Sequence, residues 1–343
     1  MTSKERVNAA LNFQETDHVP VAVFDAGVWI SEHTGLSLQE IMDLEDGGAE
    51  IAKEYYDILE SDIVYAGAGT FGAAIQAFGA KADFSGAGIS ADISPLSNDP
   101  EFYKTIDLSS VRETLLANPG IQSQLRQTRR LKELVGDEKY VSTLTGAPFT
   151  NAGVLFGVQD LMLCLLDGDI DLKPLFDLGA AIAVENNNLL LEAGADMVFM
   201  GDAVASGTLI SQKMYNEIVF PLTKRVIEQL ENPEHIFIHI CGDVTSRLEG
   251  MAGLGIDGFS VEGVNLAEAL PITYGKYSIM GNLVPYDVMV HKTPKEVYAI
   301  SEELCKTAGR KGGFILAPGC DLPSKAPLEN VLAMVSAAKA CNG

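Results

Sequence analysis

The chain has 343 residues, with 47 acidic and 24 basic side chains, and its formal net charge is −23. Such a negative surface repels both nucleic acid and anionic membranes, so we expect neither as a partner. Because 47% of the residues are hydrophobic and 21% are charged, the chain can bury a large core, and its composition excludes a disordered protein.

Residues 1–11 predict the start of an amphipathic helix rather than a signal peptide, because they contain no long apolar run. Two uncharged stretches, 63–80 and 140–159, are interrupted by Gly, Thr, Gln, Asn or Pro, and we expect neither to span a membrane. The five Cys are an odd number and widely scattered, which indicates reduced thiols or metal ligands. We therefore expect a cytoplasmic protein.

Eight short apolar runs recur along the chain, each nearly continuous in hydrophobicity, as is typical of buried parallel strands. In chain order the predicted strands are 19–24, 62–66, 140–145, 196–201, 236–241, 258–262, 277–282 and 313–318. Helix starts with capping-box spacing fall between them, at Ser37 with Glu40, Ser110 with Glu113 and Thr293 with Glu296. This alternation favours an α/β fold, a (β/α)8 TIM barrel in a single domain over residues 1–343 with an N-terminal helical extension. An open doubly wound sheet is the alternative.

The segment 71–110 is long for a single connection, and we expect an excursion near the barrel mouth with a short hairpin or loop around 80–92. Just before it, residues 67–72 match the G-x-G-x-x-G pattern of dinucleotide sites. Such a site also needs a helix directly after the glycines and an acidic residue about 20 positions further on. The apolar stretch here reaches only Phe78 before another Gly, so we favour a loop beside the pocket.

The sharpest feature is the sequence His239-Ile240-Cys241, at the end of the predicted strand 236–241. Residues i and i+2 of a strand point to the same face, so His239 and Cys241 can reach one metal ion. Two further candidates are Cys320, which follows the last predicted strand, and Glu262, which ends the strand 258–262. All four lie at the carboxyl ends of predicted strands, where (β/α)8 barrels carry their active sites.

One imidazole, two thiolates and an exchangeable carboxylate suit Zn²⁺ better than Mg²⁺ or Ca²⁺. We therefore predict one zinc ion per chain, with His239, Cys241, Cys320 and Glu262 as ligands of an open, catalytic site. The alternatives are a core histidine beside small buried cysteines, and a closed structural zinc site. A structural site usually takes its ligands as two close-spaced pairs, which these residues are not.

The charge balance of this ligand set indicates its chemistry. Two thiolates neutralise Zn²⁺, so the ion is a weaker Lewis acid towards water than one held by three imidazoles. A substrate thiol at such a site keeps considerable negative charge on its sulfur and stays nucleophilic. We expect Glu262 to fill the fourth ligand position at rest and to leave when the thiol arrives, which is its predicted catalytic role. The residues therefore predict S-alkylation.

The chain resembles the uroporphyrinogen decarboxylase superfamily, and within it the zinc-dependent methylcobamide:coenzyme M methyltransferases. Besides the H-x-C and Cys set, the matching motifs are 6–11 (RVNAAL), 17–20 (DHVP), 145–150 (TGAPFT) and 280–283 (MGNL). The resemblance implies a (β/α)8 barrel that transfers a methyl group from a methyl-Co(III) corrinoid protein to a zinc-bound thiol. It also implies zinc ligation by His239, Cys241 and Cys320, with Glu262 as the ligand of the resting state.

Two departures separate the chain from the decarboxylases of this fold. Those enzymes grip substrate carboxylates with an Arg-containing stretch after the first strand, whereas residues 24–33 here contain no Arg and the pocket begins with Asp25. The acidic residue that often follows Gly-Asn-Leu is Val284 here. A decarboxylase is therefore the less favoured alternative, and a non-catalytic zinc-bound module that docks a corrinoid protein is the second.

The chain also lacks the D-x-H-x-x-G segment that supplies the lower cobalt ligand in corrinoid-binding domains, since Asp17 and His18 are adjacent. We expect a methylated corrinoid protein as partner, docked over the barrel mouth, and a small thiol such as coenzyme M or homocysteine as substrate. Asp202 and Asn282 follow or end predicted strands and are expected to line the substrate pocket. A cap or loop hydrogen bond is the alternative for each.

Overall fold

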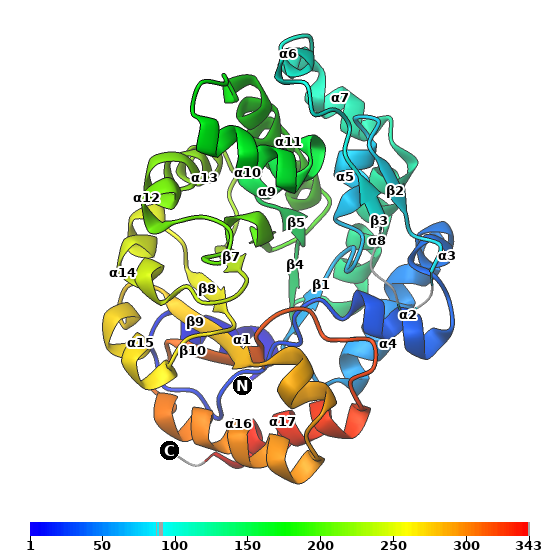
Figure 1. Ribbon diagram of the computed structural model, residues 1–343. Helices are drawn as coiled ribbons and strands as arrows, with labels where there is room; N and C mark the ends of the chain where they lie inside the picture. The colour runs from blue at the N-terminus through cyan, green and yellow to red at the C-terminus, as the bar shows by residue number, and fades with distance from the viewer. Residues whose placement is uncertain (87, 89–91, 342–343) are drawn as a thin grey trace.

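The computed structural model describes residues 1–86, 88 and 92–341. A curled sheet of parallel strands lies at its centre, with helices packed around the outside (Figure 1). The strands are β1 Ile63–Tyr65, β4 Tyr140–Ser142, β5 Thr145–Gly146, β6 Met197–Gly201, β7 His235–Ile240, β8 Gly258–Val261, β9 Ser278–Leu283 and β10 Phe314–Pro318. Their order is β1-β4-β6-β7-β8-β9-β10, with β5 paired to β6, so strands that follow each other in the chain lie side by side. The predicted α/β fold with a parallel sheet is confirmed.

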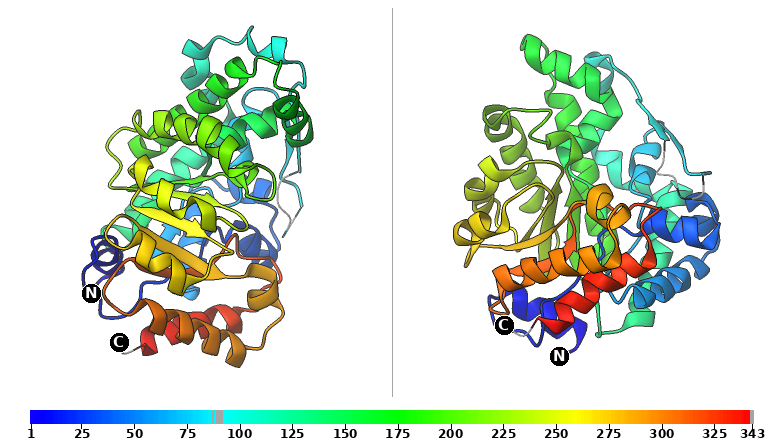
Figure 2. Two further views of the ribbon diagram at one scale, coloured as in Figure 1. Left: turned by 60° about the vertical axis from the view of Figure 1, so that its left-hand side comes forward. Right: turned by 60° about the horizontal axis from the view of Figure 1, so that its bottom comes forward.

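Helices connect the strands on the outer face, and α16 and α17 lie together beneath the last two strands (Figure 2). The helices are α1 Ser3–Leu11, α2 Gly27–Thr34, α3 Leu38–Asp43, α4 Gly47–Ile58, α5 Gly72–Gln76, α6 Pro100–Tyr103, α7 Val111–Leu116, α8 Pro119–Val135, α9 Pro148–Phe156, α10 Val158–Asp167, α11 Lys173–Glu192, α12 Gln212–Met214, α13 Phe220–Ile227, α14 Leu248–Met251, α15 Leu266–Thr273, α16 Pro294–Ala308 and α17 Leu328–Ala340. Capping boxes begin α3 and α16 as predicted. The box predicted at Ser110 is absent, because a 3₁₀ turn capped by Asp107 precedes α7.

The prediction of a strand at 19–24 was wrong. The segment lies between β10 and β1, but it makes a single parallel bridge, from Val21 to Leu316. Side-chain oxygens accept two of its N–H groups: Asp62 Oδ2 accepts from Val21 at 2.8 Å, and Ser61 Oγ accepts from Val23 at 2.9 Å. Pro20 has no N–H to donate. The segment therefore occupies the place of a strand without forming its ladder.

The predicted strand 140–145 is divided into β4 and β5. At the break, the hydroxyl of Thr143 accepts the N–H of Phe199 at 2.9 Å, which replaces a main-chain bond of the ladder. The other six predicted strands match β1 and β6 to β10, with boundaries that differ by one residue.

Aspartates begin three of the strands and hold the neighbouring segment in register. Asp62, Asp196 and Asp257 each stand one residue before a strand, namely β1, β6 and β8. Each carboxylate accepts a main-chain N–H from the adjacent segment, at 2.8 to 2.9 Å; the donors are Val21, Val141 and Ile236, respectively. The register that positions the opposite, carboxyl ends of the strands is thus fixed partly by side chains.

The excursion predicted for 71–110 contains an antiparallel pair, β2 Lys81–Asp83 with β3 Asp92–Ser94, as expected for the hairpin around 80–92. Residues 87 and 89–91 of that hairpin lie outside the described residues. No helix in the described part of the chain is by itself long and apolar enough to cross a membrane. By length and composition alone, α9 and α10 together pass that test as a pair bent by 101°.

Aromatic rings fill the inside of the curled sheet, so the sheet encloses a packed core rather than a channel. The ring of Phe24 lies 4.6 Å from that of Phe199 and 5.8 Å from that of Tyr65, measured between centroids. It also lies 4.9 Å from the imidazole of His239. The aromatic core therefore packs against His239, one of the predicted metal ligands.

Candidate metal centre

His239 is held in place by two neighbouring strands. It lies in β7, is 3% exposed, and pairs in register with Gly201 of β6 and Ser260 of β8. Its Nδ1 is 3.1 Å from Ser260 Oγ, and its Nε2 is 3.3 Å from Cys241 Sγ. With Nδ1–H donated to Ser260, the Nε2 lone pair faces the sulfur and is available to a metal ion.

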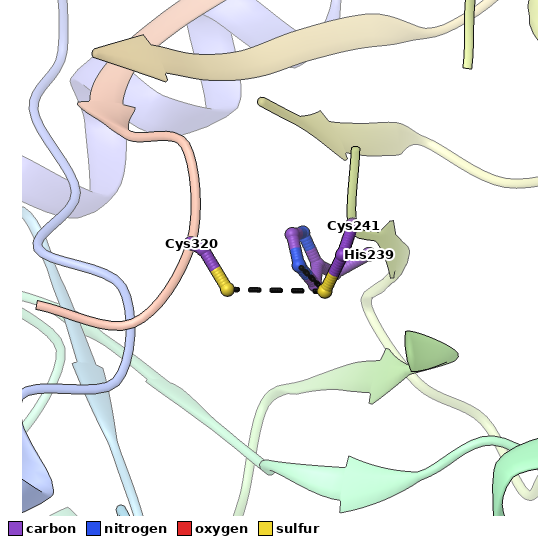
Figure 3. A group of neighbouring side chains, drawn as sticks. All are labelled: His239, Cys241 and Cys320. Carbon is purple, nitrogen blue, oxygen red and sulfur yellow. Dashed lines mark hydrogen bonds between the residues drawn. The ribbon is translucent and has the colours of Figure 1, made fainter. Parts of the chain in front are cut away.

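The predicted ligands His239, Cys241 and Cys320 are brought together (Figure 3). Their ligand atoms all lie within 4.8 Å of one another, and the two Sγ atoms are 3.9 Å apart. That separation is far longer than a disulfide bond of about 2.05 Å. A tetrahedral zinc ion with S and N ligands at about 2.3 and 2.0 Å places those ligands roughly 3.5 to 3.8 Å apart. The donor set and its spacing therefore fit zinc.

Two glycines bring the cysteines to this point. Gly242 has φ 75°, a left-handed conformation that glycine adopts easily, and it turns the chain immediately after Cys241. Gly319 precedes Cys320, and a Cβ there would lie 2.8 Å from the Cα of Glu262. The absence of a side chain at Gly319 thus lets the end of β10 approach the end of β8.

The two thiols differ in acidity because they are hydrogen-bonded to each other. This bond lowers the pKa of Cys241 and raises the pKa of Cys320, and burial adds to the rise for Cys320. The first thiolate therefore forms on Cys241 and accepts a hydrogen bond from its partner. A metal ion takes the place of both protons when it binds.

Glu262 lies beside the cluster but is not one of its members among the described residues. Its Oε2 accepts the main-chain N–H of Gly242 at 3.1 Å. It lines, together with Cys320 and Asp321, an outer hollow of about 540 Å³. Its role as a fourth ligand stays a prediction.

A smaller cavity of about 100 Å³ opens directly onto the three ligands. Its remaining walls include residues of β5 and β6 and Phe71, which belongs to the segment 67–72 that we favoured as a loop over a dinucleotide site. The residues that line the cavity include Phe24, Asp25, Phe71, Thr145, Thr150, His239, Cys241, Cys320 and Asp321.

Asp202 and Asn282, predicted to line the pocket, are not among the described residues that line this cavity. Asp202 is 1% exposed, and its Oδ1 accepts from the N–H and the hydroxyl of Thr150 at 3.0 and 2.8 Å. Burial raises the pKa of Asp202 to about 6. Asn282 donates from Nδ2 to the carbonyl of Val264 at 2.6 Å. Loop hydrogen bonds, the alternative for both residues, describe them in this structure, and a substrate-binding role stays a prediction.

Sequence reasoning missed Ser260 and Asp321. Ser260 stands two residues before Glu262 in a strand, so it shares a face with that residue, and this parity could have placed it next to His239. Asp321 follows Cys320, but its position at the cavity depends on the course of a loop, which carries no periodic signal.

The curled parallel sheet and the His-Cys-Cys cluster together define the class of this protein. It is an α/β protein with a candidate metal centre at the carboxyl ends of its strands. The model of the family described as "Uroporphyrinogen decarboxylase (URO-D)" matches residues 2–341. The chain belongs to this family.

Several relatives in the family are methyltransferases. The chain is 31% identical over 196 residues to the methylated-thiol–coenzyme M methyltransferase of Methanosarcina mazei, which covers 57% of this chain and 52% of that relative. It is 29% identical over 239 residues to the methylcobamide:CoM methyltransferase MtaA of Methanosarcina barkeri, covering 69% of this chain and 68% of that relative. The methylcobamide:CoM methyltransferase MtbA of Methanosarcina mazei is 27% identical and covers 98% of both chains. The chain thus spans about half of the first relative and nearly all of the third.

A solved structure has the same fold. It is titled a methyltransferase from Methanosarcina mazei and superposes with a TM-score of 0.86 over 98% of each chain. The two sequences are 23% identical, so this likeness shows the fold alone.

Proposed function

We propose that this protein is a corrinoid-dependent methyltransferase, which moves a methyl group from the methyl-Co(III) corrinoid of a separate partner protein to a small thiol. The observation that carries the proposal is the convergence of His239, Cys241 and Cys320 at the carboxyl end of the sheet. The names of the relatives, methylcobamide:CoM methyltransferases, support the same activity and make coenzyme M one candidate acceptor.

The finer features of the proposal concern the metal and the fold. We assign one zinc ion per chain to His239, Cys241 and Cys320, with Glu262 as the exchangeable fourth ligand. We also propose that the segment 19–24 completes a (β/α)8 barrel and that residues 1–343 form a single domain. The hydrogen bonds of Val21 and Ala22 to both neighbouring segments support this closure. The scattered free cysteines support a cytoplasmic location.

When bound, zinc supplies the positive charge that keeps an acceptor thiol deprotonated near neutral pH. Ser260 orients the imidazole of His239, and Phe24 packs against that ring, so the site is rigid before the substrate arrives. In the overall reaction an S–CH3 bond forms and the Co–CH3 bond breaks. The electron pair of the broken bond stays on cobalt as Co(I), and the proton of the thiol is released to solvent. The protein contributes mainly positioning and activation of sulfur.

The composition of the cavity disfavours the decarboxylase alternative. A substrate with several carboxylates needs cationic partners. Neither Lys nor Arg lines the cavity or the outer hollow in the part of the chain that the structure describes.

The direct test is a methyl-transfer assay with zinc-loaded protein, a methylated corrinoid protein and a small thiol. The conversion of methyl-Co(III) to Co(I) is monitored in this assay. Cys320→Ser removes a ligand, and we expect it to lower both zinc content and transfer, the latter by more than about 100-fold. Cys164→Ser is the matched control, because Cys164 is half-buried in α10 outside the cluster, and it should leave both unchanged. Absence of transfer to every thiol, or full activity of Cys320→Ser, would contradict the proposal.

Glu262→Gln separates a catalytic site from a docking module. If Glu262 is an exchangeable ligand, the substitution changes turnover while the free energy of unfolding stays close to that of the wild type. A purely structural metal site predicts that turnover never occurs and that stability and zinc content fall together.

A further inference from the structure

Among the described residues, the charged side chains that line the two spaces beside the cluster are all Asp or Glu. Asp25 and Asp321 line the cavity that opens onto the three ligands, and Asp321 and Glu262 line the outer hollow. Neither Lys nor Arg lines either space among the described residues, and the residues left undescribed (87, 89–91 and 342–343) include neither type in the sequence. Any charged group of the acceptor therefore meets acids.

Asp25 is the most constrained of these acids. It is 6% exposed and forms no ion pair within the described residues. Its φ is 31°, an unfavourable conformation for a residue with a side chain. The turn is held by two hydrogen bonds: Gly27 N–H donates to Oδ1 at 3.1 Å, and Leu322 N–H donates to the Asp25 carbonyl at 3.2 Å. The structure therefore fixes a buried carboxylate at the cavity and supplies no cation to balance it.

Burial raises the pKa of Asp25 to about 6. A carboxylate that is buried without a partner is destabilised in its charged form, and a cation at hydrogen-bond distance relieves that cost. A positively charged ligand group is thus the natural complement of this position.

The hydroxyl groups of the cavity are already committed to protein partners. Thr145 Oγ1 donates to Asn187 Oδ1 at 3.1 Å and accepts from Asn187 Nδ2 at 2.9 Å. Thr150 Oγ1 donates to Asp202 Oδ1 at 2.8 Å and accepts from the N–H of Val204 at 3.1 Å. An anionic group on the acceptor finds neither a cation nor a free threonine hydroxyl here.

We infer that the thiol acceptor of this enzyme carries an ammonium group, which Asp25 and Asp321 recognise, so that aminothiols are preferred over sulfonate-bearing thiols such as coenzyme M. This inference rests on the proposed function. A divalent ion with two cysteine thiolates is neutral, the acceptor thiolate adds one negative charge, and the buried pair of Asp25 and Asp321 adds further negative charge. A sulfonate increases that excess at short range, whereas an ammonium group reduces it.

Three thiols with the same two-carbon skeleton isolate the effect of charge: cysteamine with an ammonium group, 2-mercaptoethanol with a hydroxyl, and coenzyme M with a sulfonate. Their dissociation constants are measured by calorimetry on the zinc-loaded full-length protein. We expect cysteamine to bind about tenfold or more tightly than coenzyme M, with 2-mercaptoethanol between them. Equal binding, or tighter binding of coenzyme M, overturns the inference.

The variant Asp25→Asn tests whether the preference for an ammonium group over a sulfonate comes from the cavity. We expect it to reduce the cysteamine-to-coenzyme M ratio about tenfold while zinc content is unchanged. Asp137→Asn is the matched control, because it removes the same charge from a side chain that is 96% exposed, and it should leave the ratio as in the wild type. If Asp25→Asn does not fold, Asp321→Asn makes the same test, and an unchanged ratio in the folded variant contradicts the assignment.

The binding and transfer measurements distinguish a failure of the charge preference from a failure of the proposed function. Methyl transfer that proceeds best with coenzyme M sustains the proposed function and overturns the charge preference. Tight, Asp25-dependent binding of cysteamine without methyl transfer to any thiol sustains the charge preference of the site and overturns the proposed function.

Discussion

The two ends of the sheet both hold buried aspartates, but with different partners. At the end where strands begin, Asp62 and Asp196 are ion-paired. At the opposite end lie Asp25 and Asp202. Asp62 contacts Arg6 at 2.7 Å, and Asp196 contacts Lys132 at 2.8 Å and Lys4 at 3.1 Å. Asp25 and Asp202 form no ion pair among the described residues, and burial raises the pKa of each to about 6. The carboxylates that are ion-paired fix the register of strands. Those without a cationic partner leave negative charge unbalanced, and a ligand or a reaction can use that charge.

The strongest test of the paired end is Arg6→Met. It leaves the carboxylate of Asp62 buried without its cation, and we expect the free energy of unfolding to fall by about 3–5 kcal/mol in urea titrations. Arg130→Met is the control, because Arg130 and Glu50 form a partly exposed pair at 2.6 Å, and solvent-screened pairs of that kind contribute little to stability. Equal losses in the two variants would remove the distinction between the ends.

At the opposite end, Ser260→Ala tests whether a neutral hydrogen bond positions the metal ligand. The substitution removes the partner of His239 Nδ1, and we expect zinc affinity in chelator competition to fall about 10- to 100-fold while the fold is retained. Ser301→Ala is the control: this serine is equally buried, but its hydroxyl has no hydrogen-bond partner in the described part of the chain. An unchanged affinity in Ser260→Ala would show that the histidine needs no such support.

Gly319→Ala tests how the end of the sheet that carries the His-Cys-Cys cluster places Cys320. The added Cβ meets the Cα of Glu262 at 2.8 Å, so the segment that carries Cys320 must shift. We expect zinc affinity to fall about tenfold, since ligand placement is lost rather than a ligand. Gly250→Ala, at a helical position with open space around the new methyl group, should leave affinity unchanged. A wild-type affinity in Gly319→Ala would mean that this approach of β10 to β8 is not needed.

The smallest effect concerns acid stability at the paired end. The hydrogen bonds from Arg6 hold the pKa of Asp17 well below its usual range. A lowered pKa contributes stability that is present above the unfolded pKa of about 4 and is lost as pH falls below it. Asp17→Asn should therefore flatten the decline of the unfolding free energy below about pH 4, whereas the exposed Asp137→Asn should not. Superimposable curves for Asp17→Asn and the wild type would contradict this contribution.

The parallel sheet was predictable because buried strands are marked by continuous apolar runs, and six of the eight predicted strands needed no other signal. The segment 19–24 has the same composition and still forms no strand, since Pro20 and the side chains of Ser61 and Asp62 replace its ladder. Side-chain acceptors of this kind leave no mark in the hydrophobic pattern.

The convergence of the His-Cys-Cys cluster was predictable for a different reason. Strand parity places His239 and Cys241 on one face, and the shared edge of the sheet adds Cys320. The exact position of Glu262 could not be predicted from the sequence. Its carboxylate accepts the N–H of Gly242, and this contact depends on the left-handed turn after Cys241. The charge of the cavity likewise depends on where the loops carrying Asp25 and Asp321 meet, which only the structure gives.

The central claim is that His239, Cys241 and Cys320 hold a zinc ion that receives an acceptor thiol. Metal analysis with zinc X-ray absorption, on protein purified without chelator and with or without added cysteamine or coenzyme M, tests it directly. We expect about one zinc per chain, with sulfur ligation rising from two to three atoms when a thiol binds. Protein without tightly bound zinc, or a zinc site whose ligation is unchanged by either thiol, would contradict the account.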